Sequence, residues 1–368
     1  MTRLRFEVAS RAGLAARRGR LYTAHGPVDT PAFMPVATHG AVKGVAPWQL
    51  EELGAGMVLS NAYHLAQRPG VEVVRALGGV HGLLGWSGPI LTDSGGFQLY
   101  SLAGLLRIDD DGVEYRSHVD GRRGRFTPEY AVEVQEAIGV DVAMCLDDCV
   151  GADAPAARVE QALRRTTAWA RRSVAARRRE DTALFGIVQG GFDPALRARS
   201  AAEITAVGFD GHAVGGLCVG EPAEQTLEIA AATVAHLPHD RPRYVMGVGT
   251  PRDLLTFVSM GYDLFDCVLP TRNARNGMLF TREGKLSIRN ARHAGDPRPV
   301  DEACSCPTCG RFSRGALRHL MMTGEMLGAQ LASLHNLHFY LHLMREIRAA
   351  LDEGTFPARA QAAAGAWA

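Results

Sequence analysis

The stretch LTDSGGFQ, residues 91–98, is a short apolar run that ends at Asp93 and then breaks into two glycines. Burying a carboxylate at the end of a strand costs free energy unless the charge is paired or hydrogen-bonded, so such a residue often has a function. The glycines that follow allow backbone conformations that other residues rarely adopt. A turn or a helix N-cap is the ordinary role of one such aspartate, so its interpretation depends on how the other strands end.

Seven more runs have the same form: each is apolar and rich in strand-forming residues, ends in a glycine or a polar residue, and precedes a helical pattern. Together with ILTDSGG (90–96), they are FMPVAT (33–38), MVLSNAY (57–63), VAMCLDD (142–148), LFGIVQGG (184–191), HAVGGL (212–217), YVMGVG (244–249) and LFDCVLP (264–270). Continuous apolar runs are typical of strands that are buried on both faces of a parallel sheet.

The segments between these runs read as amphipathic helices. In TPEYAVEVQEAIG (127–139), Thr127 is expected as the N-cap, Pro128 as the first helical residue and Gly139 as the residue after the end. Eight strand-then-helix units over roughly 240 residues predict an α/β fold of the (β/α)8 TIM-barrel type rather than an open doubly wound sheet.

Active sites of such barrels lie where the strands end, on the loops that lead into the helices. Six of the predicted strands end in a polar side chain or bare backbone, at Asp93, Asp147, Gln189, Gly216, Gly247 and Asp266. Turns and helix caps could explain one such strand end, but they are a weak explanation for six. We therefore expect these residues to surround one mouth of the barrel.

Near the C-terminus, Cys304, Cys306 and Cys309 form a C-x-C-x2-C cluster that Pro307 and Gly310 bend. The cluster predicts a closed tetrahedral zinc site of the Cys3His type, with one Zn2+ per chain. Four protein ligands leave no position for a reactive water, so this zinc should be structural. Spacing alone leaves four histidines as candidates for the fourth ligand: His319, His335, His338 and His342. We expect His335 to begin a new helix.

Composition sets broad limits. The chain has 368 residues, 46% of them hydrophobic, and a formal charge of +1, so no overall charge attracts nucleic acid or membranes. Seven cysteines argue against a disulfide framework and for a cytoplasmic protein. No apolar run is long enough for a membrane helix. We predict a barrel with a short N-terminal β segment over residues 1–290, and a zinc-binding subdomain with C-terminal helices over residues 291–368.

Several long motifs occur in a fixed order: DSGGFQ from 93, DDC from 147, VQGG from 188, VGGLCVGE from 214, MGVGTPRDL from 246, FDCVLPTRNARNG from 265, and C-x-C-x2-C followed by HN. Over nearly its whole length the chain resembles the tRNA-guanine transglycosylase family of bacterial type. The resemblance implies a zinc-containing barrel that acts as a homodimer in queuosine biosynthesis. It also implies His335, in the HN pair, as the fourth zinc ligand.

The implied reaction replaces guanine at wobble position 34 of tRNAs with GUN anticodons (Asp, Asn, His and Tyr) by 7-aminomethyl-7-deazaguanine (preQ1). By resemblance, Asp266 is the nucleophile that attacks C1′, and Asp93 accepts and donates the proton of the departing and entering bases. Exchange at one carbon with retained configuration fits two displacements through a covalent enzyme–tRNA intermediate. Such chemistry needs one ionised carboxylate and a second acid whose protonation alternates.

The family's base pocket maps onto this sequence. Asp147 would accept hydrogen bonds from N1–H and the 2-amino group of a 7-deazaguanine, and Gln189 and the Gly216 N–H would bond its exocyclic oxygen. Phe97 and Met246 would sandwich the ring, although on pattern alone both read as core residues. The implied substrate-binding positions are Asp93, Ser94, Gly95, Gly96, Phe97, Asp147, Gln189, Gly216, Leu217 and Met246.

The resemblance implies contacts with the tRNA anticodon loop at two segments, where arginines would meet phosphates and base edges. Their residues are Gly247, Val248, Gly249, Thr250, Pro251, Arg252 and Asp253, and Thr271, Arg272, Asn273, Ala274 and Arg275. The wobble base would be swivelled out of a single-stranded loop. The arginine-rich stretch 164–180 is interpreted mainly as a solvated helix face.

Two alternatives stay open. One is a sister enzyme that takes queuine or an archaeal deazaguanine; Cys149 and Val219 favour the bacterial type, because the eukaryotic pattern has a valine and a glycine there. The other is a non-catalytic tRNA-binding partner subunit, which should have lost the acids, whereas Asp93 and Asp266 are both present.

Overall fold

The computed structural model describes residues 4–11, 15–96, 106–117 and 119–363. Its main sheet has eight parallel strands in the order β4-β14-β13-β12-β11-β10-β6-β5. These strands are β4 (Ala32–Met34), β5 (Val58–Asn61), β6 (Ile90–Asp93), β10 (Val142–Met144), β11 (Ala183–Val188), β12 (Gly211–Val214), β13 (Arg243–Val245) and β14 (Leu264–Asp266). All eight predicted strands are confirmed. Each is shorter than its apolar run, because the run continues into the loop or helix that follows the strand.

The sheet closes on itself between β4 and β5. The Leu59 N–H donates to the Pro35 carbonyl at 3.0 Å, and the Ala37 N–H donates to the Leu59 carbonyl at 2.6 Å. The last strand, β14, pairs with β4, so that Asp266 lies beside Met34. The predicted (β/α)8 barrel is therefore confirmed, and the carboxyl ends of its strands meet at one mouth.

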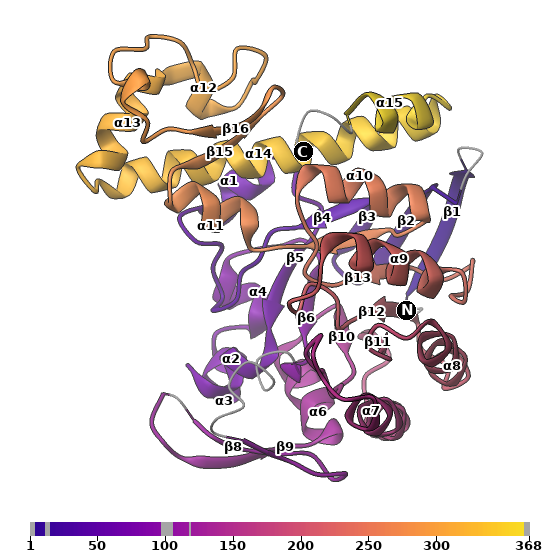
Figure 1. Cartoon of the computed structure of the whole chain (residues 1–368). Coiled ribbons are helices and arrows are strands. Elements are labelled where there is room, and N and C mark those ends of the chain that lie inside the picture. Colours follow the sequence, from indigo (N-terminus) through magenta and orange to yellow (C-terminus); the bar gives the residue numbers. More distant parts are fainter. Residues whose placement is uncertain (1–3, 12–14, 97–105, 118, 364–368) are drawn as a thin grey trace.

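Helices cover the outside of the barrel (Figure 1). They are α1 (Pro47–Glu52), α2 (Ala62–Gln67), α3 (Val71–Ala76), α4 (Gly79–Leu84), α6 (Pro128–Ile138), α7 (Ala156–Ala176), α8 (Pro194–Thr205), α9 (Ala223–Val234), α10 (Pro251–Met260) and α11 (Leu269–Arg275). Helix α6 begins as predicted: the Thr127 side chain accepts from the Tyr130 N–H, and Gly139 ends the helix at φ 78°.

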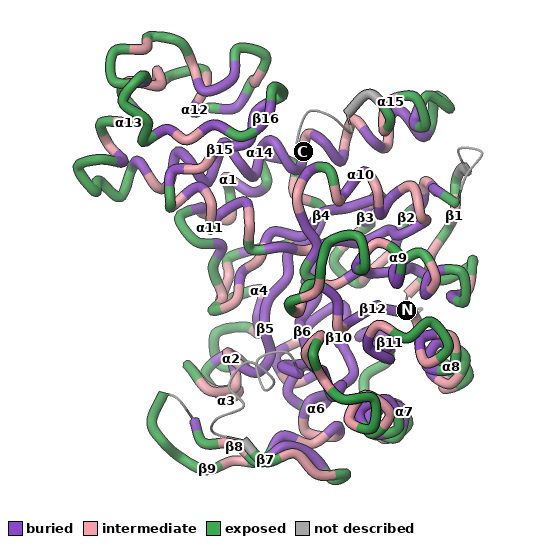
Figure 2. The backbone as a smooth tube through the Cα atoms, viewed as in Figure 1, coloured by how far each residue is buried: buried purple, intermediate pink, exposed green. Residues whose placement is uncertain are grey.

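The barrel strands are buried along their length, as Figure 2 shows. Every residue of β11 is buried, which explains why its sequence is continuously apolar rather than alternating. Three antiparallel elements lie outside the barrel: a sheet of β1 (Arg5–Arg11), β2 (Arg17–Thr23) and β3 (Gly26–Thr30), a sheet of β7 (Leu106–Ile108), β8 (Val113–Arg116) and β9 (Arg123–Phe126), and a hairpin of β15 (Met278–Thr281) and β16 (Gly284–Ser287).

The C-terminal part consists of α12 (Pro307–Arg311), α13 (Arg314–Met322), α14 (Met326–Asp352) and α15 (Phe356–Ala363). Helix α14 runs from the cysteine cluster along the barrel and packs against α11 and β4 (Figure 1). A second hydrophobic cluster includes Leu279 and Val300, so it draws on both sides of residue 290. The domain boundary stays a prediction. Within the described residues, no helix is long and apolar enough to cross a membrane.

Candidate active site

A cavity of about 490 Å³ opens at the carboxyl ends of the strands. Five of the six residues predicted at the mouth line it: Asp93, Asp147, Gly216, Gly247 and Asp266. The sixth, Gln189, is buried behind it and donates from Nε2 to the Asp147 carboxylate at 2.6 Å. The structure thus gathers three carboxylates from β6, β10 and β14 around one space, and the six strand ends around one mouth.

Asp266 is the last residue of β14, and the neighbouring strand β13 and the loop after it hold its carboxylate. The Tyr244 hydroxyl donates to Oδ1 at 2.5 Å, and the Gly247 N–H donates to the same oxygen at 2.8 Å. Among the described residues, no hydrogen bond is found to Oδ2. Burial raises the pKa of Asp266, and the two hydrogen bonds oppose this shift. Oδ1 is therefore held by two donors, and Oδ2 is not held in this way by the residues that the structure describes.

Asp93 is the last residue of β6 and lies directly opposite Asn61 of β5 in the parallel register. Asn61 Nδ2 donates to Asp93 Oδ2 at 3.0 Å, and the Gly95 N–H donates to Oδ1 at 3.2 Å. Asn61 is itself oriented, because its Oδ1 accepts from the His64 N–H at the start of α2. Gly95 has φ +98°, and a Cβ there would lie 2.6 Å from the Cβ of Tyr63. Asn61 was not among the predicted site residues, although an amide at the end of a predicted strand is a signal of the same kind as Asp93.

Asp147 is buried just beyond β10, and burial raises its pKa to about 7. The hydrogen bond from Gln189 opposes this rise in pKa, and the nearby charges of Asp93 and Asp148 add to it. Gly96 passes so close that a Cβ there would lie 2.2 Å from Asp147 Oδ1. Asp147 is thus an acid that can change its protonation state near neutral pH.

Adjacent Asp148 has a different role. Its carboxylate binds Arg158 at 2.5 Å and Arg165 at 2.6 Å, and both of its oxygens are used in these ion pairs. Asp148 therefore stabilises the packing of α7 on the barrel and does not face the cavity.

The other predicted base-binding residues differ in whether they reach the cavity. Ser94 is buried, and its Oγ accepts from the Gly96 N–H at 3.4 Å. Leu217 and Met246 line the cavity, together with Cys149 and Val219. Phe97 lies outside the described residues.

The loop after β12 is held by Glu221. The carboxylate of Glu221 accepts from the Cys218 N–H at 2.5 Å and from the Val219 N–H at 2.8 Å. Cys218 adopts φ 58°, a value in the left-handed region that residues other than glycine seldom adopt. Bonds from two successive amides to one carboxylate fix the course of the backbone that follows Leu217.

The first predicted RNA segment leads into α10. Thr250 and Asp253 form a capping box there, with Pro251 in the first turn, so their polar atoms are used at the helix start. Gly247 and Gly249 line the cavity. Arg252 is exposed and Val248 is buried.

The second predicted RNA segment belongs to α11. Arg272 is exposed and lines the cavity, whereas Thr271 and Ala274 are buried. Arg275 and Asn273 are half-buried. Of the five residues in this segment, Arg272 is therefore the one whose side chain is most accessible to a polynucleotide.

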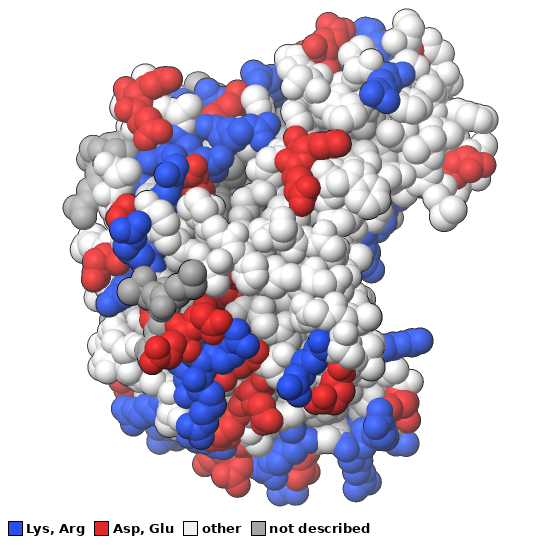
Figure 3. All heavy atoms as spheres, turned by 180° about the vertical axis from the view of Figure 1, so that it is seen from behind, with Lys and Arg blue, Asp and Glu red and all other residues white. Residues whose placement is uncertain are grey.

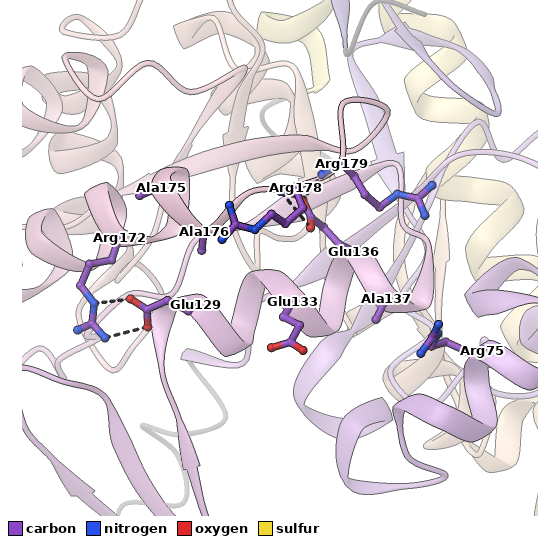
Figure 4. Close-up of a pocket in the computed structure, with 10 residues that line it drawn as sticks. All are labelled: Arg75, Glu129, Glu133, Glu136, Ala137, Arg172, Ala175, Ala176, Arg178 and Arg179. Carbon is purple, nitrogen blue, oxygen red and sulfur yellow. Dashed lines mark hydrogen bonds and ion pairs between the residues drawn. The ribbon is translucent and has the colours of Figure 1, made fainter.

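The arginine-rich stretch 164–180 is largely paired within the chain. Carboxylates bind four of its guanidinium groups, those of Arg165, Arg172, Arg177 and Arg179. A cavity of about 720 Å³ lies between α6 and α7. Arg172 bonds Glu129 at its edge (Figure 4). Figure 3 shows the face opposite to that of Figure 1, where basic and acidic side chains are also interspersed. The interpretation of this stretch as a charged helix face agrees with these pairs.

Cys304, Cys306, Cys309 and His335 form a cluster that could hold a metal ion. Nδ1 of His335 lies 3.8, 3.5 and 3.3 Å from the three sulfurs. Bond lengths to zinc of about 2.3 Å for sulfur and 2.0–2.1 Å for nitrogen place tetrahedral ligands roughly 3.6 Å apart, so the residues fit. His335 Nε2 lies 2.8 Å from the Phe280 carbonyl, to which it would donate, and this bond fixes the ring.

The structure separates the four candidate histidines. His338 Nδ1 lies 3.4 Å from the sulfur of Cys304 but is not part of the cluster. His319 is exposed on α13, and His342 pairs with Glu346. His335 lies in the middle of α14, so the prediction that it begins a new helix was wrong. Helix α14 continues through it because this part of the helix is buried between barrel elements such as β4 and the helices α12 and α13.

The family model and the curated relatives that match this chain carry the same family name. The family model described as queuine tRNA-ribosyltransferase matches residues 12–368. A queuine tRNA-ribosyltransferase of Methylobacillus flagellatus is 51% identical over 94% of this chain and 93% of that relative. Two relatives with the same name are equally similar. The protein of Nitrosomonas europaea is 52% identical over 93% of this chain and 92% of that relative. The protein of Thermus thermophilus is 51% identical over 97% of this chain and 92% of that relative.

The Asp147 carboxyl should titrate with a midpoint near pH 7. Isotope-edited infrared spectroscopy with labelled aspartate, assigned by difference against Asp147→Asn, measures this midpoint. Asp93→Asn should lower it, because a neighbouring negative charge is removed. Since the pKa is raised in the folded state, the free energy of unfolding should fall as the pH rises from about 4 to about 7, and this fall should be smaller in Asp147→Asn. A midpoint at the ordinary value of about 4 would contradict this account.

Proposed function

Because the chain belongs to the queuine tRNA-ribosyltransferase family, we propose that it exchanges guanine at wobble position 34 of tRNAs for Asp, Asn, His and Tyr, with GUN anticodons, for preQ1 in queuosine biosynthesis. The observation that carries the proposal is the pair of acids, Asp93 and Asp266, that line one cavity from separate strands. Base exchange at a single carbon requires two such groups.

In the first displacement, Asp266 attacks C1′ and the bond from C1′ to N9 of guanine breaks, while Asp93 supplies a proton to the leaving base. The sugar is then held to Asp266 as an ester. In the second displacement, Asp93 takes the N9 proton of the entering base, whose nitrogen attacks C1′ and releases Asp266. Two inversions retain the configuration. The hydrogen bonds of Tyr244 and the Gly247 N–H to Asp266 support a role as an oriented nucleophile.

Recognition of the base would use the residues around Asp147. Its ionised carboxylate is an acceptor only, which suits the N1–H and 2-amino donors of a guanine-like ring. The Gln189 amide and the Gly216 N–H lie beside it and would donate to the exocyclic oxygen. The Leu217 carbonyl would accept from the aminomethyl group of the entering base, a charge-assisted bond that guanine cannot form.

The tRNA would approach over α11 and the turn into α10. Arg272 lies exposed at the cavity, where it would contact the anticodon loop while the wobble base is swivelled inside. The ion in the cysteine cluster would be a structural zinc, since the cluster offers four protein ligands. The homodimer and the cytoplasmic location stay predictions.

Asp266→Ala should reduce base exchange by about four orders of magnitude or more. Binding of tRNA should stay within a few-fold of the wild type, because the acid acts on C1′ and contributes little to the ground-state complex. With an inhibitory base analogue, a denaturing gel should show a trapped protein–tRNA adduct for the wild type and none for the variant. Exchange that survives in Asp266→Ala would reject its role as nucleophile.

His335→Ala should bind less than one zinc per chain and should destabilise the C-terminal part, because a closed zinc site supplies folding free energy. The matched control is His338→Ala, which removes the neighbouring histidine outside the cluster and should keep one zinc. Atomic absorption measures the content, and thermal unfolding reports the stability. Full zinc in His335→Ala with loss in His338→Ala would reverse the assignment.

Val219→Gly should admit queuine, which the wild type should exclude in favour of preQ1. Val219 and Cys149 both line the cavity, and forcing a bulky cyclopentenediol against the Val219 side chain should cost roughly 1–3 kcal/mol. Competition between the two bases for incorporation into tRNA is the measurement. A wild-type protein that takes queuine as readily as preQ1 would instead be a sister enzyme.

A further inference from the structure

Arg197 of α8 is fully buried behind the candidate base pocket. Its guanidinium donates to four backbone carbonyls: Nε to Gly191 at 2.8 Å, Nη1 to Val188 at 3.1 Å and Gly215 at 2.8 Å, and Nη2 to Gly216 at 3.2 Å. These carbonyls belong to the ends of β11 and β12, the two strands that carry Gln189 and Gly216. One side chain therefore holds both elements that would face the exocyclic oxygen of the base.

A buried cation without a carboxylate is costly, and no ion pair to Arg197 is found among the residues that the structure describes. Burial lowers the pKa of Arg197 to about 10, so the guanidinium stays charged at neutral pH. An apolar side chain of similar size would avoid the cost of burying a charge, but it would leave the carbonyls of Gly191 and Gly215 without these donors. The arginine thus supplies something other than packing, namely a rigid fork of donors.

The guanidinium of Arg197 fixes the direction of the Gly215–Gly216 peptide group. The Gly215–Gly216 peptide is not among the cis bonds of the structure, and in a trans peptide the C=O and the N–H point in opposite directions. Since Arg197 holds the Gly215 carbonyl on the side away from the mouth, the Gly216 N–H is turned toward the cavity that both glycines line.

The same helix also holds Gln189. One turn after Arg197, Ser200 accepts the Gln189 N–H on its Oγ at 3.1 Å. Gly216 has φ +65°, and a Cβ there would lie 2.4 Å from Gln189 Oε1. The amide of Gln189 and the backbone of Gly216 are therefore packed as one unit, with Arg197 at its back.

We propose that Arg197 is a positioning residue for base recognition: it aims the Gly216 N–H at the exocyclic oxygen of the base. The inference rests on the proposed function, and it names the group that sets the selectivity of this site for an oxygen at that position. Arg197 contacts neither the base nor the tRNA; it acts through the two peptides it holds.

Arg197→Lys tests the proposal, because lysine keeps the charge but cannot bond four carbonyls from one plane. The probes are guanine and 6-thioguanine, which share N1–H and the 2-amino group but differ in the acceptor, since sulfur is weaker. Dissociation constants come from competition against labelled guanine. The matched control is Arg243→Lys, a buried arginine that donates to the Leu237 and Pro238 carbonyls at the opposite end of the barrel.

We expect Arg197→Lys to weaken guanine about five- to tenfold, the scale of one hydrogen bond, and 6-thioguanine by less than about twofold. Arg243→Lys should leave the ratio of the two constants unchanged. An equal loss for both bases, or no loss, in a folded Arg197→Lys would overturn the proposal. Arg197→Gln, which keeps two donors, should give an intermediate ratio, and failure of both variants to fold would assign Arg197 to the fold alone. A wild-type protein that binds no guanine would reject the proposed function instead.

Discussion

Three carboxylates meet at one end of the barrel: those of Asp93 and Asp147 are buried, and that of Asp266 is half-buried. The neighbouring residues are arranged to keep them there. Like charges so close in a low dielectric repel one another and resist ionisation. The fold provides a separate set of hydrogen-bond donors for each acid. Asn61 and the Gly95 N–H bond Asp93, and the Gln189 amide bonds Asp147. Tyr244 and the Gly247 N–H bond Asp266. Each set bonds its acid differently, so the three acids have different surroundings and can take different roles.

The same constraint explains the glycines and the buried arginine. Gly95 and Gly96 lie where any side chain would collide with Tyr63 or with Asp147. Arg197 occupies the space behind the pocket and holds carbonyls that would otherwise be buried without donors. The chemistry is therefore concentrated on one face of the barrel, while ion pairs such as Asp148 with Arg165 hold the outer helices in place.

Much of this arrangement could be predicted from the sequence, because strands buried on both faces leave continuous apolar runs and end at recognisable glycines and acids. The run ILTDSGG predicted both the strand β6 and the position of Asp93. Other features have no local signal. Tyr244 reads as a core residue, and its role appears only when β13 and β14 pair. Arg197 lies in a helix with several arginines, and nothing in its neighbourhood distinguishes it.

Contacts between distant segments account for the remaining differences. Spacing could not choose among four histidines, because the choice depends on how α14 crosses the cysteine loop, and the helix was expected to break before His335. The short sheet β7–β9 was not predicted, since its strands expose one face and lack a long apolar run; its buried side chains pack on Trp169 of α7 and Tyr63 of α2.

The central claim is that the two acids exchange one base for another on tRNA. The most direct measurement is the release of labelled guanine from a tRNA with a GUN anticodon, with and without preQ1. The account predicts release that depends on preQ1 and incorporation of one preQ1 for each guanine lost, with the chain of the tRNA intact. Retention of all label when preQ1 is present, or release accompanied by an abasic site instead of a new base, would contradict it.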